Sequence, residues 1–198
     1  ETIIFSLQNV YSAFDEDVFF YFVLQTKKVD FELKSFLDYH NISELPFELK
    51  IENFFSISHA RNLCIEKARV GRYEYILFHD ASIFISFDSA TFLADNREKN
   101  CPVKLKVGFP EDFSERCSYQ LKKRHDVIHP FSSKKINPIY DSYVWAYLFK
   151  VPSIKSFFSL EYGPGEVSKY KSGEDVIFLF EYFSSCGCFD VVQSLDCY

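Results

Sequence analysis

Residues 58–86, with the sequence SHARNLCIEKARVGRYEYILFHDASIFIS, constrain the fold of this chain more than any other stretch. A serine and a run of helix-forming residues come first, and Gly71 follows them as a helix stop. Residues 75–78 are apolar throughout, as in strands that helices cover on both faces. Asp80 comes just after them. The segment therefore predicts a helix, a short turn and a buried strand that ends on an acid.

The helix of this segment is expected to begin at Ser56 or Ser58, since either serine can accept a hydrogen bond from the first turn. Apolar and small residues recur on one face of it with a helical period. The predicted buried stripe consists of Ala60, Leu63, Cys64 and Ala68.

Strands and helices alternate along the first half of the chain. Apolar or alternating runs predict strands at residues 2–6, 18–24 and 47–51. A helix is expected to begin at Asp30, between the second and third of these strands. This order favours an α/β fold, a Rossmann-like domain with a mixed, mostly parallel central sheet flanked by helices.

The second half of the chain predicts further elements. Alternation favours a strand at residues 103–109 with Lys104 on its solvent face, and residues 125–140 are predicted as a loop. Helices are expected at residues 88–98, 111–124, 141–149 and 174–183. Neither a linker nor an internal repeat divides the sequence, so we expect one domain over residues 1–198.

Composition excludes several classes of protein. Of the 198 residues, 47% are hydrophobic and 19% are aromatic, which predicts a substantial core. The formal net charge of -6 argues against a nucleic-acid binder, because such proteins present a basic face to the phosphates. No apolar run approaches the roughly 20 residues of a membrane span, and the N-terminus lacks the layout of a signal peptide.

The cysteines indicate a reducing compartment. The six of them form no CxxC pair, and Cys186 and Cys188, which flank Gly187, suit neither an unstrained disulfide nor a complete zinc site. We therefore expect reduced thiols in a cytoplasmic protein. The sequence has no methionine, which suggests a processed start or a domain cut from a longer polypeptide.

Polar residues are predicted to meet beyond the carboxyl ends of the strands, where open parallel sheets bind ligands. Gln8 and Asn9 follow the predicted first strand, and Asp80 follows the buried one. Arg61 and Asn62 lie in the first turn of a helix, whose free N–H groups favour anions. A diphosphate would suit this combination. The alternative is a surface arginine and an aspartate that caps a turn.

The triplet Gly173-Glu174-Asp175 places two acids at the start of an otherwise apolar helix. Acids at a helix N-terminus are stabilised by the helix dipole, so a capping role alone would explain them. An apolar helix is buried, however, and its start is expected to project from the core toward a cleft. A carboxylate in that place can remove the proton of an incoming hydroxyl.

The order of these motifs resembles the family 2 glycosyltransferases, which have the GT-A fold. The matching stretches are Ala-Arg-Asn at residues 60–62, YILFHDAS at residues 75–82, Val144-Trp145, and Gly-Glu-Asp at residues 173–175. The resemblance covers roughly residues 55–90 and 140–183.

The resemblance implies a role for each matching residue. Arg61 would face the nucleotide or its phosphates, and Asp80 would be the first acid of a metal-binding DxD motif that holds manganese or magnesium. Trp145 would shape the sugar or acceptor pocket. Asp175 would be the base that activates the acceptor hydroxyl, and Glu174 would bind the acceptor or the donor sugar. A divalent metal and a cationic side chain would stabilise the charge that develops on the leaving diphosphate.

The sequence also departs from the family pattern. Ser82 stands where the second acid of the DxD motif is expected, and a hydroxyl is a weaker metal ligand than a carboxylate. His125 or His129 could complete the metal site, with an ordinary place in a loop as the alternative.

The nucleotide-binding half departs as well. Lys27 and Lys28 follow the strand at 18–24, where the family has an acidic pair. Recognition of the nucleotide base then falls to Gln8, Asn9 or Gln25.

The resemblance implies a metal-assisted glycosyltransferase. It would move a hexose or 6-deoxyhexose from a nucleoside-diphosphate sugar, in the first place a UDP-sugar, to a glycan hydroxyl. Two alternatives stay open, a retaining transferase of the same fold and a non-catalytic glycan- or nucleotide-binding domain. A nucleotidyltransferase is disfavoured because no glycine-rich phosphate loop lies near the N-terminus.

Overall fold

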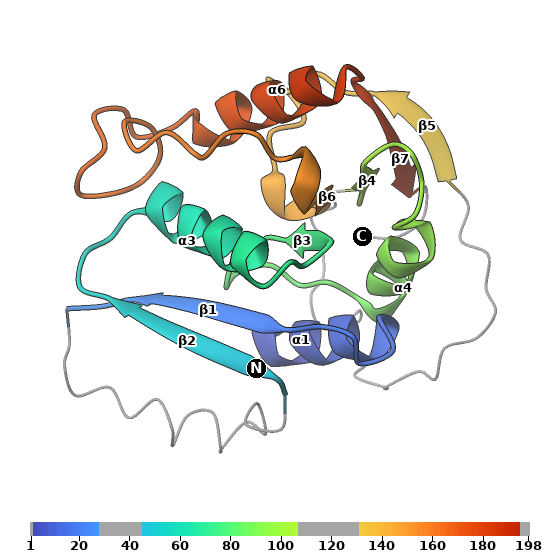
Figure 1. Ribbon diagram of the computed structural model, residues 1–198, viewed down its shortest axis with the longest axis horizontal. Helices are drawn as coiled ribbons and strands as arrows, with labels where there is room; N and C mark the ends of the chain where they lie inside the picture. Colours follow the sequence, from blue (N-terminus) through green and yellow to red (C-terminus); the bar gives the residue numbers. More distant parts are fainter. Residues whose placement is uncertain (1, 28–44, 107–130, 195–198) are drawn as a thin grey trace.

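A computed structural model describes residues 2–27, 45–106 and 131–194 and shows a mixed α/β fold. Within these ranges the chain forms four α-helices and two sheets (Figure 1). The helices are α1 (Thr2–Ala13), α3 (Ile57–Val70), α4 (Phe87–Asn96) and α6 (Glu174–Cys186). The strands are β1 (Phe20–Gln25), β2 (Phe47–Glu52), β3 (Tyr75–Leu77), β4 (Val103–Lys104), β5 (Phe131–Lys135), β6 (Tyr147–Lys150) and β7 (Asp190–Ser194). Two short 3-10 helices, η2 (Val144–Ala146) and η3 (Val151–Ser153), flank β6.

The two sheets differ in how their strands run. β1 and β2 form a parallel pair, and the larger sheet has the order β3-β6-β4-β7-β5. In the larger sheet only β4 and β7 are parallel, whereas β6 runs against both of its neighbours and β5 runs against β7. The described strands therefore do not form the mostly parallel central sheet predicted from the sequence.

The strand β6 occupies the place where a helix was predicted over residues 141–149. Tyr147, Leu148 and Phe149 are consecutive and all buried, which a central strand achieves because both of its faces are covered. A surface helix would bury only one stripe. β6 follows the 3-10 turn η2 directly, and it enters the sheet antiparallel between β3 and β4.

The N-terminal segment also differs from its prediction. Residues 2–6 were expected to form a strand, but they open α1. The buried residues Ile4, Leu7, Val10 and Ala13 recur every three positions, which places them on one helical face. A short apolar run does not distinguish a strand from a helix, and the run continues here with a helical period. Gln8 and Asn9 consequently lie on a helix and not in a turn after a strand.

Several predicted elements are confirmed. β1, β2 and β3 form where strands were expected, and α3 has Ser56 as its N-cap and Gly71 as its C-cap. The Ser56 hydroxyl accepts a hydrogen bond from the N–H of His59 at 3.3 Å. α6 begins at Glu174 as predicted and continues to Cys186.

The buried face of α3 is rotated from the predicted stripe. Ser58, Arg61, Ile65 and Ala68 are the buried residues, and of the predicted stripe only Ala68 is among them. The rotation turns Arg61 inward, where acidic side chains meet it. A sequence pattern that scores arginine as a surface residue cannot anticipate this.

Lys104 and the segment 125–140 also depart from expectation. Lys104 is only 5% exposed, and its ammonium donates a hydrogen bond to Asp141 at 2.6 Å, so a carboxylate takes the place of the expected solvent. β5 forms inside the predicted loop, where its backbone pairs with β7. α4 has Ser86 as its N-cap and begins at Phe87, one residue before the start predicted at residue 88. The predicted helices beginning at Asp30 and spanning 111–124 lie outside the described residues.

An aromatic cluster lies where α3, α6 and the larger sheet meet. Phe158 and Phe178 stack with ring centroids 4.0 Å apart, and Phe78 and Phe149 contact Phe178 edge-on at 6.1 and 5.5 Å. The four rings come from the residue that follows β3, from β6, from α6 and from the segment before α6. Of these rings, that of Phe158 also contacts the Arg61 guanidinium described below.

In the described ranges we find no helix long and apolar enough to cross a membrane.

Candidate functional site

Arg61 in the second turn of α3 is the centre of a cluster of carboxylates. Its Nη1 donates a hydrogen bond to Oδ1 of Asp175, and its Nη2 lies 3.3 Å from Oδ2 of Asp80. Oε1 of Glu174 lies 3.9 Å from the same Nη1. Asp80 follows β3 and the two other acids open α6, so three separate parts of the chain meet at one guanidinium. The structure thus brings together four of the residues that the sequence motifs singled out.

The guanidinium is enclosed. The side chain of Arg61 is 8% exposed, and its Cζ lies 5.3 Å from the ring centroid of Phe158. Its buried Nε has no acceptor among the described residues. Because a buried charge is costly unless it is paired, the carboxylates compensate for the burial of this arginine. Arg61 therefore acts first as a structural bridge between Asp80 and Asp175.

Asp175 is mostly buried in the first turn of α6. Burial raises its pKa to about 6, an effect that Arg61 opposes and Glu174 reinforces. Its side chain keeps 19% of its surface exposed, and its Oδ2 lies 3.5 Å from the backbone N–H of Val144. A general base is most effective when its pKa lies near the working pH, so this environment suits the removal of a proton from a hydroxyl.

Glu174 is held by a close approach of the backbone. Gly163 has a φ of 94°, and a Cβ at this position would lie 2.8 Å from Cδ of Glu174. Gly173, the N-cap of α6, also has a positive φ of 100°. Two glycines with left-handed conformations thus let residues 163–173 fold against the start of α6.

The start of α3 is tied to the segment before α6. The Asn62 side chain forms two hydrogen bonds with the backbone of Phe158, at 2.9 and 2.8 Å, and the Ser58 hydroxyl donates to the carbonyl of Tyr162 at 2.9 Å. Asn62 was predicted to bind the nucleotide sugar, and in the structure its amide is occupied by the backbone. Its position fixes the wall of the site beside Arg61.

Asp80 is the most open of the acids, with a side chain that is 39% exposed. Ser82 is exposed nearby in the chain, and Asp80 accepts only long hydrogen bonds from Arg61, at 3.3 and 3.4 Å. No group of three histidine, cysteine or acidic residues suited to a metal occurs in the described part of the chain. A magnesium-type ion is commonly held by one or two carboxylates together with ligand phosphates, and Asp80 fits that donor set. His125 and His129 lie outside the described residues.

The remaining predicted residues lie around this cluster or apart from it. Trp145 belongs to η2, next to Val144, and its ring contacts Tyr143 with centroids 5.4 Å apart. Asn9 on α1 donates to the carbonyl of Ile85 at 3.0 Å, and Gln8 on the same helix is half-buried. No contact described here links Gln8 or Asn9 to Arg61.

Gln25 has a structural partner. At the end of β1, its amide exchanges two hydrogen bonds with the backbone of Ser56, at 2.8 and 3.2 Å. These bonds attach the N-cap of α3 to the smaller sheet. Gln25 thereby helps to orient the helix that carries Arg61.

Sequence reasoning missed three residues near the site. His79 precedes Asp80, and its Nε2 is hydrogen-bonded to the Ser6 hydroxyl at 2.6 Å. Burial lowers the pKa of His79, which favours the neutral ring. Phe158 and Tyr162 were also missed. Their place shortly before the Gly-Glu-Asp triplet was the only signal available, and it carries no chemistry of its own.

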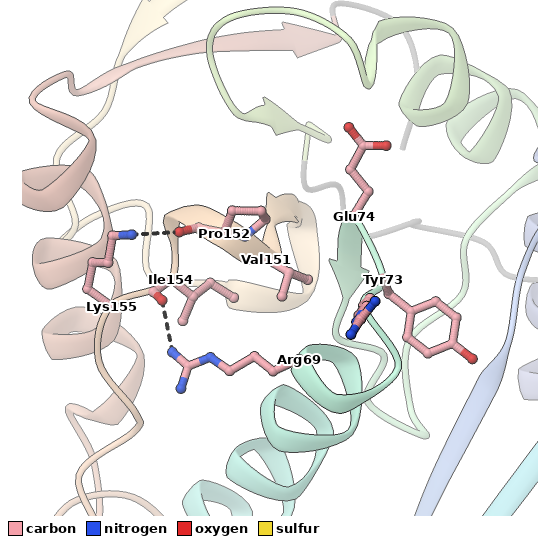
Figure 2. Close-up of a pocket in the computed structure, with 8 residues that line it drawn as sticks. Arg69, Tyr73, Glu74, Val151, Pro152, Ile154 and Lys155 are labelled. Atoms are coloured by element: carbon pink, nitrogen blue, oxygen red, sulfur yellow. Dashed lines mark hydrogen bonds between the residues drawn. The ribbon is translucent and has the colours of Figure 1, made fainter.

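A separate pocket of about 640 Å³ lies at the other end of α3 (Figure 2). Its lining includes Arg69, Tyr73, Glu74, Pro152 and Lys155. Figure 2 shows Arg69 pointing to the carbonyl of Ile154 and Lys155 to that of Pro152, with hydrogen bonds of 2.9 and 2.7 Å. Arg69 follows Arg61 by about two helical turns, or about 12 Å along the axis. This pocket is therefore distinct from the Arg61 cluster.

Comparisons with models of known protein families, with curated proteins and with solved structures give no match to this chain.

Proposed function

We propose that the Arg61 cluster is the active site of a glycosyltransferase that uses a nucleoside-diphosphate sugar and a glycan acceptor. The observation that supports this proposal is the convergence of Asp80 and Asp175 on one buried arginine. The Ala-Arg-Asn stretch, the acid after β3 and the Gly-Glu-Asp triplet lie in three separate parts of the chain, and their charged side chains meet at one guanidinium.

In this proposal the two aspartates have different tasks because their environments differ. Asp80 is open to solvent and faces the diphosphate, whereas Asp175 is mostly buried with a pKa raised to about 6. Two carboxylates in different environments can take different roles in one site, one as a base and one as a charged ligand. Arg61 holds both carboxylates in place and lowers the electrostatic cost of bringing a diphosphate near them.

The proposed transfer begins with the acceptor hydroxyl against Asp175. The carboxylate takes the hydroxyl proton while the acceptor oxygen attacks the anomeric carbon of the donor sugar. The bond between that carbon and the diphosphate oxygen breaks, and the diphosphate leaves with the electron pair. A divalent metal at Asp80, when bound, would stabilise the charge on the diphosphate. This order of events inverts the anomeric centre.

Nucleotide binding and turnover test the proposal. At least one of the nucleotides UDP, GDP and dTDP, each tested with and without manganese, should raise the melting temperature of the protein. The matching nucleotide sugar should then be turned over, and Asp80→Asn should abolish both effects. Asp17→Asn serves as the matched control, because Asp17 is an exposed aspartate in the turn after α1. If no nucleotide shifts the melting temperature under any condition, the proposal is wrong.

A non-catalytic glycan- or nucleotide-binding domain is the second candidate. It is favoured by the exposed Ser82, which leaves Asp80 as the only acid of the expected DxD motif. Measurable turnover of a nucleotide sugar, even slow hydrolysis, would count against this candidate.

A retaining transferase is distinguished from an inverting one by NMR of the product, since the new linkage either keeps or reverses the anomeric configuration of the donor.

We also propose a reducing, cytoplasmic setting. Cys64, Cys101, Cys186 and Cys188 are free thiols in the structure, as such a setting requires.

A further inference from the structure

Tyr162 and Tyr170 form a stacked pair in the segment that leads into α6. Their ring centroids lie 4.9 Å apart with an interplanar angle of 23°, and a parallel β-bridge joins the two residues. The N–H of Tyr170 donates to the carbonyl of Glu161 at 2.8 Å, which closes the loop between them. Tyr170 is 45% exposed. A rigid aromatic surface thus faces solvent.

This pair lies beside the proposed catalytic acids. Gly163 follows Tyr162 and packs on Glu174, and a Cβ at Gly173 would lie 3.5 Å from the Tyr162 ring. The carbonyl of Tyr162 accepts the Ser58 hydrogen bond from α3 at 2.9 Å. Figure 1 shows this segment looping out beside the first turns of α3 and α6. The aromatic pair is therefore fixed to both helices that supply the site.

Further apolar side chains are exposed on the same segment and its neighbour. Phe55, Leu160 and Val167 all present much of their surface to solvent. The N–H of Glu166 donates to the carbonyl of Phe55 at 2.7 Å, so the two segments are joined. Exposed apolar groups that gather beside polar ones are typical of a binding surface.

The charges around the pair favour a neutral ligand. Lys27 is paired with Glu166 at 2.9 Å, and the Lys171 ammonium donates to the carbonyl of Gly165 at 2.7 Å. Lys169 lies 5.2 Å from the Tyr170 ring, and Glu161 is exposed nearby. The three ammonium groups exceed the two carboxylates by one, but the Lys27 ammonium is paired with Glu166 and the Lys171 ammonium is bound to backbone carbonyls. Glu174 and Asp175 lie beyond them, so the pair is not surrounded by the cluster of unengaged cations that would favour a diphosphate.

We infer that Tyr162 and Tyr170 form the acceptor subsite and bind a neutral carbohydrate ring. A pyranose has a face of C–H groups that packs on an aromatic ring, while its equatorial hydroxyls stay free for hydrogen bonds. Stacking on this pair would place the sugar ring beside the start of α6, the helix that carries Asp175. The assignment of this subsite to the acceptor rests on the proposed function, but the binding of a sugar to the tyrosine pair can be tested independently of that function.

Saturation-transfer NMR with methyl β-glucopyranoside and methyl β-galactopyranoside, both at millimolar concentration, tests the inference. At least one of them should receive saturation at its ring C–H protons from the full chain. Tyr170→Ala should weaken its binding roughly three- to tenfold, since a single aromatic contact is lost. Tyr170→Phe should restore binding, because the ring is kept. Tyr140→Ala is the matched control, since Tyr140 is a strongly exposed tyrosine on another loop.

Binding of UDP by the same variants separates the two proposals. If Tyr170→Ala weakens UDP and leaves the glycosides unaffected, the pair stacks the nucleotide and the inference is wrong. If neither glycoside binds, the inference is also wrong, whatever the result for UDP. If a glycoside binds through Tyr170 and no nucleotide binds at all, the sugar subsite holds and the transferase proposal fails.

Discussion

Arg61 and Asp175 form an ion pair across 114 positions of the chain, between the second turn of α3 and the first turn of α6. The pair connects the start of one helix to the start of another, and Asp80 joins it from the end of β3. Helix starts and strand ends are where a fold presents unpaired backbone groups and open space. The position of this pair, more than its strength, makes it a candidate site.

Arg61→Ala is expected to destabilise the protein by about 3–5 kcal/mol. The substitution leaves the mostly buried carboxylates of Asp175 and Glu174 without their cation, and unpaired buried charges are costly. Urea unfolding measures the loss. Arg72→Ala is the control, because Arg72 is exposed, and it should change stability by less than about 0.5 kcal/mol. A loss of the same small size at Arg61 would show that the pair is not buried in solution.

Asp175 should make stability fall as the pH rises. Its pKa is about 6 in the folded protein and 3.8 without the fold, so the folded state binds the proton more tightly between these values. This stabilising contribution is complete below about pH 4 and is lost as the pH rises through about 6. The unfolding free energy of the natural protein, relative to Asp175→Asn, should therefore decrease by roughly 2–3 kcal/mol from pH 4 to pH 7. A difference that stays constant with pH would contradict the raised pKa.

The same group predicts the pH profile of the proposed reaction. If Asp175 removes the acceptor proton, turnover should fall tenfold per unit below about pH 6, because the protonated acid cannot act as a base. Asp175→Asn should bind the nucleotide as the natural protein does and lose transfer to the acceptor. Steady-state rates against pH, with nucleotide binding measured in parallel, check both statements. Full activity of the variant would remove Asp175 from this role.

Gly163→Ala should destabilise the protein by roughly 1–3 kcal/mol, because an alanine at a φ of 94° is strained and its Cβ would press on Glu174. Gly187→Ala is a sharp control. Gly187 also has a positive φ, of 66°, but nothing lies within 4 Å of its Cβ position, so only the backbone strain of about 1 kcal/mol remains. Thermal unfolding compares the two variants. Equal losses would mean that contact with Glu174 contributes nothing.

Cys64 should react slowly with iodoacetamide, and Cys186 should react quickly. Burial raises the pKa of the Cys64 thiol to about 12, so almost no reactive thiolate exists at neutral pH, whereas Cys186 is exposed at the end of α6. Mass spectrometry of peptides at several reaction times gives the two rates. Rapid labelling of Cys64 without loss of the fold would show that its thiol is not buried in solution.

The motifs predicted the candidate site better than the periodicities predicted the sheet. Arg61, Asp80 and Asp175 lie at element ends that local signals define well, namely a serine cap, an apolar strand and a Gly-Glu-Asp triplet. Their convergence follows once those elements pack on one core. Local signals therefore place these three residues at element ends, but they do not predict that the buried face of α3 includes Arg61.

The larger sheet depends on pairings that no local signal records. β6 was not predicted as a strand because a fully buried strand and a buried helix share the same apolar composition. β5 was not predicted because residues 131–135 are largely polar. The backbone pairing with β7 stabilises this strand. Lys104 was assigned to solvent by alternation, but its partner Asp141 lies in a distant turn.

The close packing of Gly163 on Glu174 also limits how this site can vary among relatives. A side chain at position 163 would press on the carboxylate end of Glu174 and would be strained at a φ of 94°, so this position favours glycine as long as the acidic pair of α6 is kept. A change at position 163 is therefore best tolerated together with a change at Glu174, which couples two positions that lie 11 residues apart in the chain.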